Sequence, residues 1–284
     1  VSESTHIQND QRNRAVAFKD VFAWNISEVS GLDFGTDFSR ISSWGTSVNE
    51  EGKIADDRFK NNETKYAGFV SYRLFSEKWK GSVGLRYEYV HAINTDQGEV
   101  KNRNDYSDLL PSLSLSTSLG KVDMSLDFSS RVNRPSFRQL NNSVSYNNQY
   151  HYEQGNIYLK PQYVYDAEFS LDYGIFDFKV DYQYIKDYIH PTVVAIAGKP
   201  GTVAWMSTNA DRFQQLGAQC VVAPVIGCWR PTLTAGVYKP YFTLAYNGSE
   251  TSYNRPYGLL AFQNAVELKG DWLLRGDFYW LSLI

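Results

Sequence analysis

Long apolar runs are missing from this sequence, although aromatic residues are abundant. No stretch of about 18 apolar residues occurs, which excludes a transmembrane helix. The 284 residues include 21 Tyr, 16 Phe and 7 Trp, which is too many for a disordered chain. Residues 1–6 carry neither the basic start nor the apolar core of a signal peptide. We therefore expect that the chain is either not exported by that route or lacks its own beginning.

An excess of charge of one sign is also missing. The 28 Lys and Arg residues against 31 Asp and Glu residues give a net charge of −3, so we expect no nucleic-acid partner. Cysteine is scarce as well, because only Cys220 and Cys228 are present and neither has metal-ligand spacing around it. Strand parity places the two thiols on opposite faces of one hairpin, which predicts that they do not pair. A bulge at Pro224 or Gly227 would shift the register and bring both thiols to one face, so pairing stays an open alternative.

What the sequence does contain is alternation with a period of two along its whole length. Between Trp79 and Tyr89, most odd positions are apolar or aromatic, whereas the even positions carry Lys, Ser, Gly, Arg and Glu. Side chains alternate across a strand, so such a segment has one apolar and one polar face. The pattern predicts about twelve strands, each near the roughly 9–11 residues with which a tilted strand crosses a bilayer. The predicted spans are 14–27, 31–42, 63–75, 79–94, 106–119, 121–135, 163–174, 175–190, 211–224, 228–246, 257–268 and 271–284.

The connections between these spans alternate between short and long. Short turns are predicted at 28–30, 76–78, 120, 174, 225–227 and 269–270. Long polar loops are predicted at 43–62, 95–105, 136–162, 191–210 and 247–256. A soluble sandwich has no reason to place every long loop at one end, whereas an outer membrane barrel has short periplasmic turns and long extracellular loops. Within 191–210, two apolar stretches flank a Gly/Pro turn, which predicts a protruding hairpin.

Both faces of the predicted strands fit a membrane barrel. Aromatic residues concentrate at the two strand ends, as in the belts at membrane interfaces: Trp24, Phe75, Trp79, Tyr173, Phe176, Trp229 and Trp272 at one end, and Tyr66, Tyr89, Tyr106, Tyr163, Tyr184 and Tyr188 at the other. Apolar residues predicted to face lipid include Leu113, Leu115, Met124, Leu126, Phe128, Phe169, Leu171, Phe178 and Val180. Many charged residues share the opposite face, which a wet or plugged lumen tolerates and a packed core does not: Asp33, Asp37, Arg73, Arg86, Glu88, Asp123, Asp127, Arg131, Asp166, Glu168, Asp172, Asp181, Glu267, Arg275 and Asp277.

The predicted fold is therefore all-β, an antiparallel up-and-down transmembrane β-barrel segment of about twelve strands in one domain over residues 1–284. We expect an open, incomplete barrel in which the strand at 14–27 does not pair with the strand at 271–284. Closure of twelve strands into a barrel is the geometrically allowed alternative.

Two motifs resemble those of a known family. Residues 131–141, RVNRPSFRQLN, resemble the stretch R-x-N-R-P-S-[YF]-x-x-L-N-P of TonB-dependent outer-membrane receptors, in particular of the outer-membrane β-barrel family. Residues 152–162, YEQGNIYLKPQ, resemble that family's Y-x-x-G-N-P-x-L-K-P-[EQ]. Asn142 and Ile157 stand where the family motifs have proline, which affects loop conformation only. The resemblance is good over most of 60–190 and looser elsewhere, and it implies about 22 strands around a plugged lumen, of which this chain supplies roughly half. It further implies that the chain is a barrel fragment without plug, TonB box or signal peptide.

The resemblance also implies a function and a place. The whole protein would bind a scarce nutrient, such as a glycan, peptide or siderophore, at the surface of the bacterial outer membrane. It would then move this nutrient inward with energy from the TonB complex. The implied partners are outer-membrane lipid, the TonB complex through the plug region and a surface lipoprotein. The implied barrel is no enzyme and needs no cofactor. The alternative is a passive porin-like channel or a surface adhesin barrel, which lacks a plug and a TonB box.

A dense group of Tyr, Asn and Gln side chains makes the loop 136–162 the candidate ligand site. Aromatic faces stack on apolar ligand faces, and amides bond to hydroxyl-rich ligands. The predicted ligand-binding residues are Tyr146, Asn148, Gln149, Tyr150, His151 and Tyr152. The alternative is a loop that only packs onto its neighbours at the barrel mouth.

Neither metal binding nor catalysis has comparable support in the sequence. The four histidines have no ligand spacing within one element, so we expect no metal site: His6, His91, His151 and His190. Ser136, His151 and Asp187 are available for a hydrolase site, but nothing in the sequence fixes their geometry.

Overall fold

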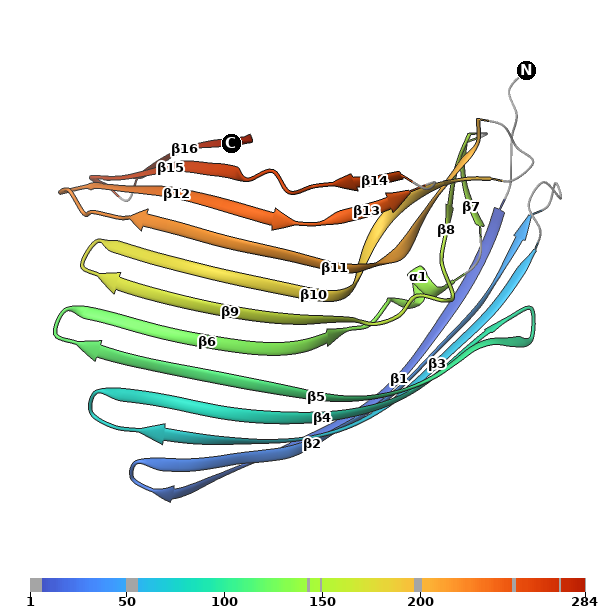
Figure 1. Cartoon of the computed structure of the whole chain (residues 1–284), viewed down its shortest axis with the longest axis horizontal. Helices are drawn as coiled ribbons and strands as arrows, with labels where there is room; N and C mark the ends of the chain where they lie inside the picture. The colour runs from blue at the N-terminus through green and yellow to red at the C-terminus, as the bar shows by residue number, and fades with distance from the viewer. Residues whose placement is uncertain are drawn as a thin grey trace.

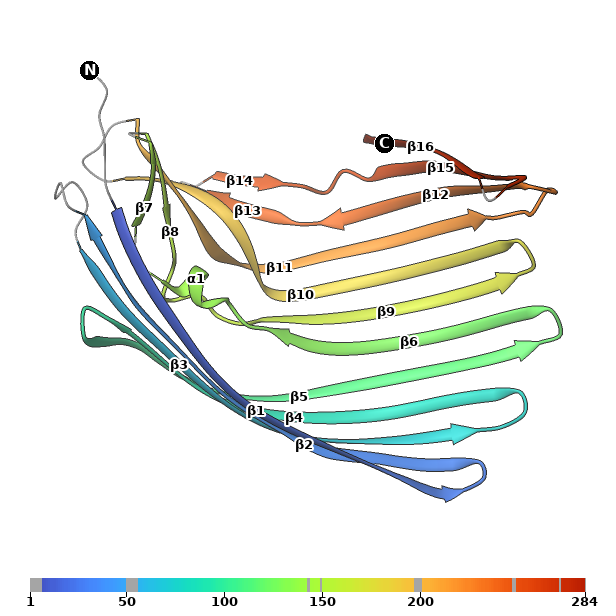
Figure 2. The ribbon, with the colours of Figure 1, turned by 180° about the vertical axis from the view of Figure 1, so that it is seen from behind.

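Twelve long strands form one curved antiparallel sheet (Figures 1 and 2). The computed structural model describes residues 7–49, 56–141, 144–148, 150–196, 201–246, 249–270 and 272–283. The strands of the sheet are β1 (Ile7–Ser27), β2 (Ser30–Asn49), β3 (Asp57–Phe75), β4 (Trp79–Asp96), β5 (Glu99–Leu119), β6 (Val122–Asn133), β9 (Gln162–Tyr173), β10 (Phe176–Ala195), β11 (Val203–Val222), β12 (Trp229–Tyr241), β15 (Tyr257–Leu268) and β16 (Trp272–Leu283). Successive strands pair in chain order, so the predicted up-and-down topology is confirmed.

The sheet is open. β1 and β16 stand at the two ends of the strand order, and no pairing joins them within the described residues. The curvature nevertheless wraps the sheet into a trough, with β1 along one rim and β16 along the other (Figure 1). The expected open wall is therefore confirmed, and the alternative of a closed twelve-strand barrel is not what the chain forms.

The connections at one end of the trough, on the left in Figure 1, are all short. Each falls where the sequence predicts a turn. Glycines with positive φ occupy four of these turns, at Gly120, Gly174, Gly227 and Gly270, with φ values of 67°, 61°, 60° and 81°. Only glycine adopts this conformation without steric cost, so these positions end the strands sharply.

The strands are longer than predicted at the opposite end, which corrects two of the predicted loops. Most of 43–62 is strand, because β2 runs to Asn49 and β3 begins at Asp57. Likewise, 95–105 contains only a two-residue turn at Gln97 and Gly98, both with positive φ, as in a tight hairpin. Beyond the bilayer both faces of a hairpin meet water, so the apolar/polar alternation that signals a strand disappears.

The remaining long connections contain shorter elements. The predicted hairpin in 191–210 is confirmed, because β10 and β11 stay paired as far as Ala195 and Val203, although 197–200 at its tip lie outside the described residues. The connection 247–256 contributes one strand of a two-stranded hairpin, β13 (Thr243–Tyr246) with β14 (Ser249–Ser252). The loop 136–162 holds α1 (Phe137–Leu140), β7 (Val144–Asn148) and β8 (His151–Gln154).

The two faces of the sheet differ as predicted. None of the nine side chains predicted to face lipid is buried, and five are clearly exposed: Leu113, Leu115, Leu126, Phe169 and Phe178. Such exposure is abnormal for a soluble protein and suits contact with lipid. On the inner face, charges predicted there form ion pairs across strands, for example Arg73 Nε with Asp33 Oδ2 at 2.7 Å. Across the described ranges, no helix is long and apolar enough to span a membrane.

The cysteines are unpaired, as predicted. Cys220 lies opposite Ala235 within the β11–β12 ladder, whereas Cys228 lies in the turn just before Trp229. The register therefore keeps the thiols apart along the hairpin.

Candidate functional site

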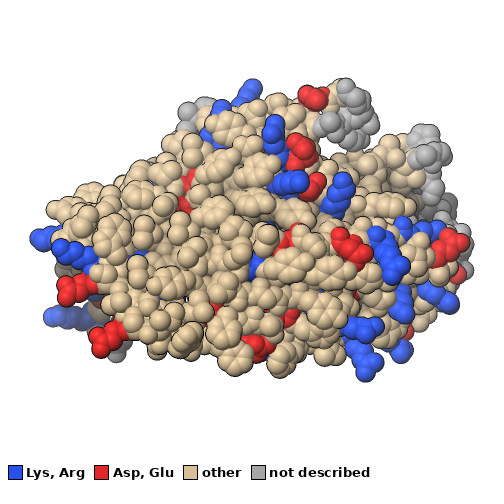
Figure 3. Space-filling model, turned by 60° about the horizontal axis from the view of Figure 1, so that its bottom comes forward, with Lys and Arg blue, Asp and Glu red and all other residues tan. Residues whose placement is uncertain are grey.

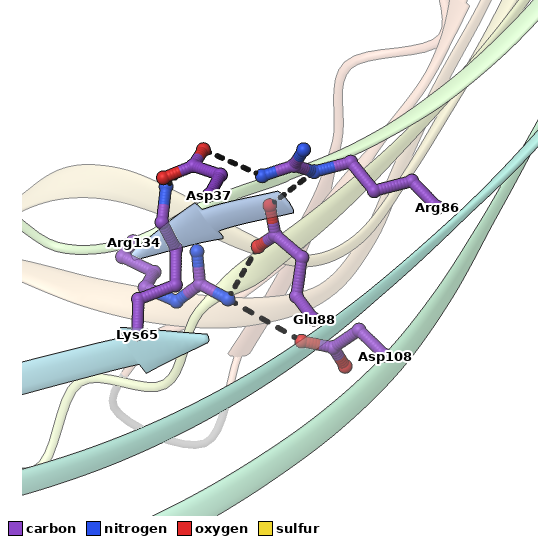
Figure 4. Close-up of polar contacts among 6 residues, drawn as sticks. All are labelled: Asp37, Lys65, Arg86, Glu88, Asp108 and Arg134. Carbon is purple, nitrogen blue, oxygen red and sulfur yellow. Dashed lines mark hydrogen bonds and ion pairs between the residues drawn. The ribbon is translucent and has the colours of Figure 1, made fainter. Parts of the chain in front are cut away.

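Six charged side chains meet on the inner wall of the trough (Figure 4). Four consecutive strands contribute five of them: Asp37 from β2, Lys65 from β3, Arg86 and Glu88 from β4, and Asp108 from β5. The sixth, Arg134, directly follows β6 and belongs to the first of the two sequence motifs. We call these six residues the inner-wall cluster.

The contacts in the inner-wall cluster form a chain. Asp37 Oδ2 accepts hydrogen bonds from Lys65 Nζ at 3.2 Å and from Arg86 Nη2 at 2.8 Å. Arg86 Nε donates to Glu88 Oε1 at 2.7 Å, and Arg134 Nη2 donates to Glu88 Oε2 at 2.9 Å. Arg134 also reaches Asp108 Oδ2 at 3.5 Å. The arrangement ties β2, β3, β4 and β5 to the start of the loop 136–162.

Burial makes this pairing matter energetically. Glu88 and Asp108 are only 6% and 7% exposed, so each carboxylate has lost most of its water. A desolvated charge is tolerated only when opposite charges and hydrogen bonds replace that water. Three cations face three anions in the cluster, so the charges balance.

The two sequence motifs fold against each other in the loop 136–162. Ser136 caps α1 in a capping box, with its side chain accepting from Gln139 N and its own N–H donating to Gln139 Oε1. The backbone of Asn156, from the second motif, donates to Gln139 O at 2.6 Å. Gly155 packs so closely that a Cβ there would overlap Asn141 O. The motif glycine therefore lets the two chain segments touch.

Replacing Gly155 with alanine is expected to destabilise this loop by about 1–3 kcal/mol, as overpacking of a tight contact does. The added methyl group would meet backbone atoms of Asn141 and Gln139, which cannot rotate away. Hydrogen exchange of 136–162, together with denaturant unfolding, would measure the effect. Gly68→Ala is the control, because its nearest atom would be 3.9 Å away. Equal protection of the loop in both variants would contradict the close packing.

The loop is also held by the walls on both sides. Asn102 Nδ2 of β5 donates to Ile157 O at 3.0 Å. On the other side, Asn209 of β11 accepts from Lys160 N at 2.9 Å and donates to Lys160 O at 3.1 Å. Ile157 and Leu159 are 4% and 2% exposed, so the loop buries an apolar core of its own. The described residues of the loop therefore bridge the trough.

A cavity of about 630 Å³ opens beside this bridge at the mouth of the trough. The ends of β1, β2 and β3 form one side, and β10 and β11 form the other. The loop contributes Arg138, Gln139, Asn141, Glu153, Gln154 and Gly155 to its lining, and β11 contributes Trp205, Met206 and Ser207. We call it the mouth cavity. Its polar side chains and single Trp suit a ligand that carries hydrogen-bonding groups.

The described residues among the six predicted ligand-binding residues lie on the neighbouring hairpin. Tyr146 and Asn148 belong to β7 and pair with Tyr152 and His151 of β8, while Gln149 is outside the described residues. Tyr152 is buried at 7% exposure, whereas Tyr150 is 53% exposed. None of the six is among the described residues that line the mouth cavity. β8 pairs in parallel with the start of β11, so this hairpin extends the protruding ribbon.

The residues considered for catalysis and metal binding are not brought together. The Ser136 side chain caps α1, His151 lies in β8, and Asp187 adopts a positive φ of 52° within β10. His190 is buried and contacts Thr208 Oγ1 through Nε2 at 3.2 Å. Across the described part of the chain, no group of three His, Cys, Asp or Glu residues could hold a metal ion.

Sequence reasoning missed an aromatic cluster at the base of the β10–β11 ribbon. The Phe242 ring lies 5.4 Å from Tyr188, 5.8 Å from Phe213 and 5.9 Å from Tyr253 between centroids. His190 completes the cluster at 5.9 Å from Phe242. Part of it borders a second cavity of about 1470 Å³ between β10, β11 and the β13–β14 hairpin. Only the sheet register brings these rings together, so the linear sequence carried no signal for them.

Solved structures similar in fold to this chain include receptors and transporters. The FrpB iron transporter from Neisseria meningitidis (F3-3 variant) matches with a TM-score of 0.59 and 14% identity, over 95% of this chain and 43% of that chain. A double mutant of the hemophore receptor HasR from Serratia marcescens, in complex with its hemophore HasA and heme, matches with a TM-score of 0.60 and 12% identity. This match covers 96% of this chain and 54% of that chain. The alcaligin outer membrane receptor FauA from Bordetella pertussis matches with a TM-score of 0.58 and 11% identity, over 98% of this chain and 47% of that chain. The chain thus spans about half the length of these structures.

Comparison at the level of sequence points to one family. No curated protein matches the chain significantly. The model of the outer membrane protein beta-barrel family, however, matches residues 2–282. This match confirms the family predicted from the two motifs. With nearly every residue covered and with an open barrel wall as its fold, the chain belongs to the outer membrane protein beta-barrel family and resides in the bacterial outer membrane.

Proposed function

We propose that this chain is part of the barrel wall of a TonB-dependent receptor that takes up a scarce nutrient. The nutrient enters at the mouth, and the receptor moves it along the polar inner wall with energy from the TonB complex. A plug region makes the contact with TonB, and a surface lipoprotein assists capture. The barrel itself performs no bond chemistry.

The mouth cavity is the observation that carries this proposal. It lies between two walls that the described residues of the loop bridge, and polar side chains make up most of its lining. A merely structural loop has no need for Arg138, Gln139, Glu153 and Gln154 around one cavity of about 630 Å³. That volume falls within the usual range for small-molecule sites.

The chemistry of the cavity favours a ligand rich in hydroxyl, amide or carboxyl groups. Glycans, peptides and siderophores all carry such groups. Tyr146, Asn148, Gln149, Tyr150, His151 and Tyr152 remain the proposed outer contacts, because their hairpin adjoins the cavity through Glu153 and Gln154. The similar structures transport iron or bind a hemophore or alcaligin, by their names, which supports uptake as the class of function.

Permeability and TonB binding of the intact protein that contains this chain would test the proposal. In proteoliposomes with external sugars, we expect no swelling, because a plugged receptor excludes passive solutes. We also expect the purified periplasmic domain of TonB to bind the protein. Swelling in small sugars without TonB binding would replace the proposal by the passive channel, and neither swelling nor TonB binding would favour the adhesin.

A further inference from the structure

Cationic side chains gather on the outer, lipid-facing side of β1, β2 and β3. Phe18, Phe38 and Tyr66 form one outward row across these strands, and the rings of Phe38 and Tyr66 are 5.2 Å apart. Arg40 follows Phe38 by two residues, which places it about 7 Å farther along the strand at roughly 3.3 Å per residue. The charges thus begin where the outer aromatic belt ends. Figure 3 shows Lys and Arg side chains crowded at this end of the molecule, on the right.

Five cations make up this group, which we call the outer basic cluster. They share the outward parity of the strands and are all exposed: Arg12, Arg14, Arg40, Arg58 and Lys60. Together with Trp44 they border a cavity of about 600 Å³.

The outer basic cluster has almost no internal compensation. Arg12 lies 3.5 Å from Asp10, but Arg14, Arg40, Arg58 and Lys60 form no ion pair with any described residue. Asp10 is the one carboxylate among the described lining residues of this cavity. Like charges that outnumber nearby carboxylates repel one another and weaken the fold. An anion from outside the chain would relieve this repulsion.

The surroundings indicate which anion fits. Arginine binds phosphate with two parallel hydrogen bonds, and Trp prefers the boundary between apolar and polar layers. Farther toward the short turns, beyond the row of Phe18, Phe38 and Tyr66, the rings of Phe22 and Phe34 stack at 5.5 Å on the same outward face. An anionic lipid carries both kinds of group, because its phosphates can lie beside the cations while its hydrocarbon chains lie beside the aromatic rings.

We propose that the outer basic cluster binds the phosphate groups of an anionic lipid in the outer leaflet. The acyl chains of this lipid lie along the apolar face of β1–β3. The lipid neutralises the four unpaired cations and fixes the height of this wall in the membrane. This site faces away from the lumen and is independent of nutrient uptake.

Lipid binding to the intact protein would test this proposal, using the triple variant Arg14→Gln/Arg40→Gln/Lys60→Gln. The control is Lys78→Gln/Lys121→Gln/Lys269→Gln, which removes the same charge from exposed positions at the short turns. Native mass spectrometry measures retention of a bisphosphorylated glucosamine lipid, its dephosphorylated analogue and phosphatidylcholine. We expect the first variant to bind the bisphosphorylated lipid about 100-fold more weakly, since each cation near an anionic surface contributes about fivefold. The control should bind like the wild type.

Several outcomes would overturn the proposal. One is equal affinity of the wild type and the first variant, and another is equal binding of the dephosphorylated lipid. A third is competition by inorganic phosphate as effective as that by the lipid, which would indicate a site for free phosphate. If the triple variant fails to fold, the single variants Arg40→Gln and Lys60→Gln test the proposal in its place. Each is expected to weaken binding of the bisphosphorylated lipid about fivefold.

Discussion

Replacing Arg134 with glutamine is expected to lower the free energy of unfolding by about 3–5 kcal/mol, the usual cost of breaking a buried ion pair. The change leaves Glu88 without its contact at 2.9 Å and Asp108 without its contact at 3.5 Å. Both carboxylates are nearly buried, so water cannot take the place of the guanidinium. Equilibrium unfolding of the intact protein in urea, refolded into vesicles, would measure the loss.

Arg138 offers a matched control four residues away. Its guanidinium pairs with Glu153 at 2.9 Å, but its side chain is 87% exposed. Exposed ion pairs are worth little, so Arg138→Gln should change stability by less than about 1 kcal/mol. The double variant Glu88→Gln/Arg134→Gln should recover part of the loss, because it removes one of the two carboxylate charges that lose Arg134. Similar losses for Arg134→Gln and Arg138→Gln would show that the inner-wall cluster is not a structural clamp.

Replacing Leu126 with arginine is expected to cost about 2–4 kcal/mol, the penalty for a cation on the lipid face near the midplane of the membrane. Leu126 is 43% exposed on the outer face, and it lies between Leu115 of β5 and Phe169 of β9. A charged head at this depth has lost its water and finds only hydrocarbon. Refolding into vesicles over a series of urea concentrations would measure the change in the free energy of unfolding.

The neighbouring residue provides the control for this experiment. Ser125 points inward, where its hydroxyl donates to Asp127 Oδ2 at 3.0 Å and lies 2.9 Å from Ser170 Oγ. Arginine at this position would meet water and carboxylates, so Ser125→Arg should stay within about 0.5 kcal/mol of the wild type. Equal costs at positions 125 and 126 would refute the assignment of the two faces.

Alternation along the chain was sufficient to establish the strands and their faces. A strand that separates lipid from a polar lumen must alternate, so Leu126 and Ser125 reveal their sides without any tertiary information. The sequence also predicted the short turns. Glycines such as Gly120 and Gly174 adopt a positive φ there, which few other residue types do. The motif at 131–141 further identified the family, which the match over 2–282 confirmed.

Alternation gave no information where both faces of a strand meet the same solvent. The extensions of β2 to Asn49 and of β5 back to Glu99 look like polar loops in the sequence. Their hydrogen bonds come from pairing with a neighbouring strand, and pairing does not depend on which side chains are polar. Only the folded sheet therefore shows that they are strands.

By itself, then, the sequence determined the number of long strands, their faces, the short turns at one end and the family. The tertiary structure decided which side chains meet. Arg134 reaches Glu88 across 46 residues, Asn209 holds Lys160 across 49, and the mouth cavity joins β1 to β11. Such contacts depend on strand register and curvature, which are set by all the strands together. Local periodicity reports only the environment of each residue, so it carries no information on its distant neighbours.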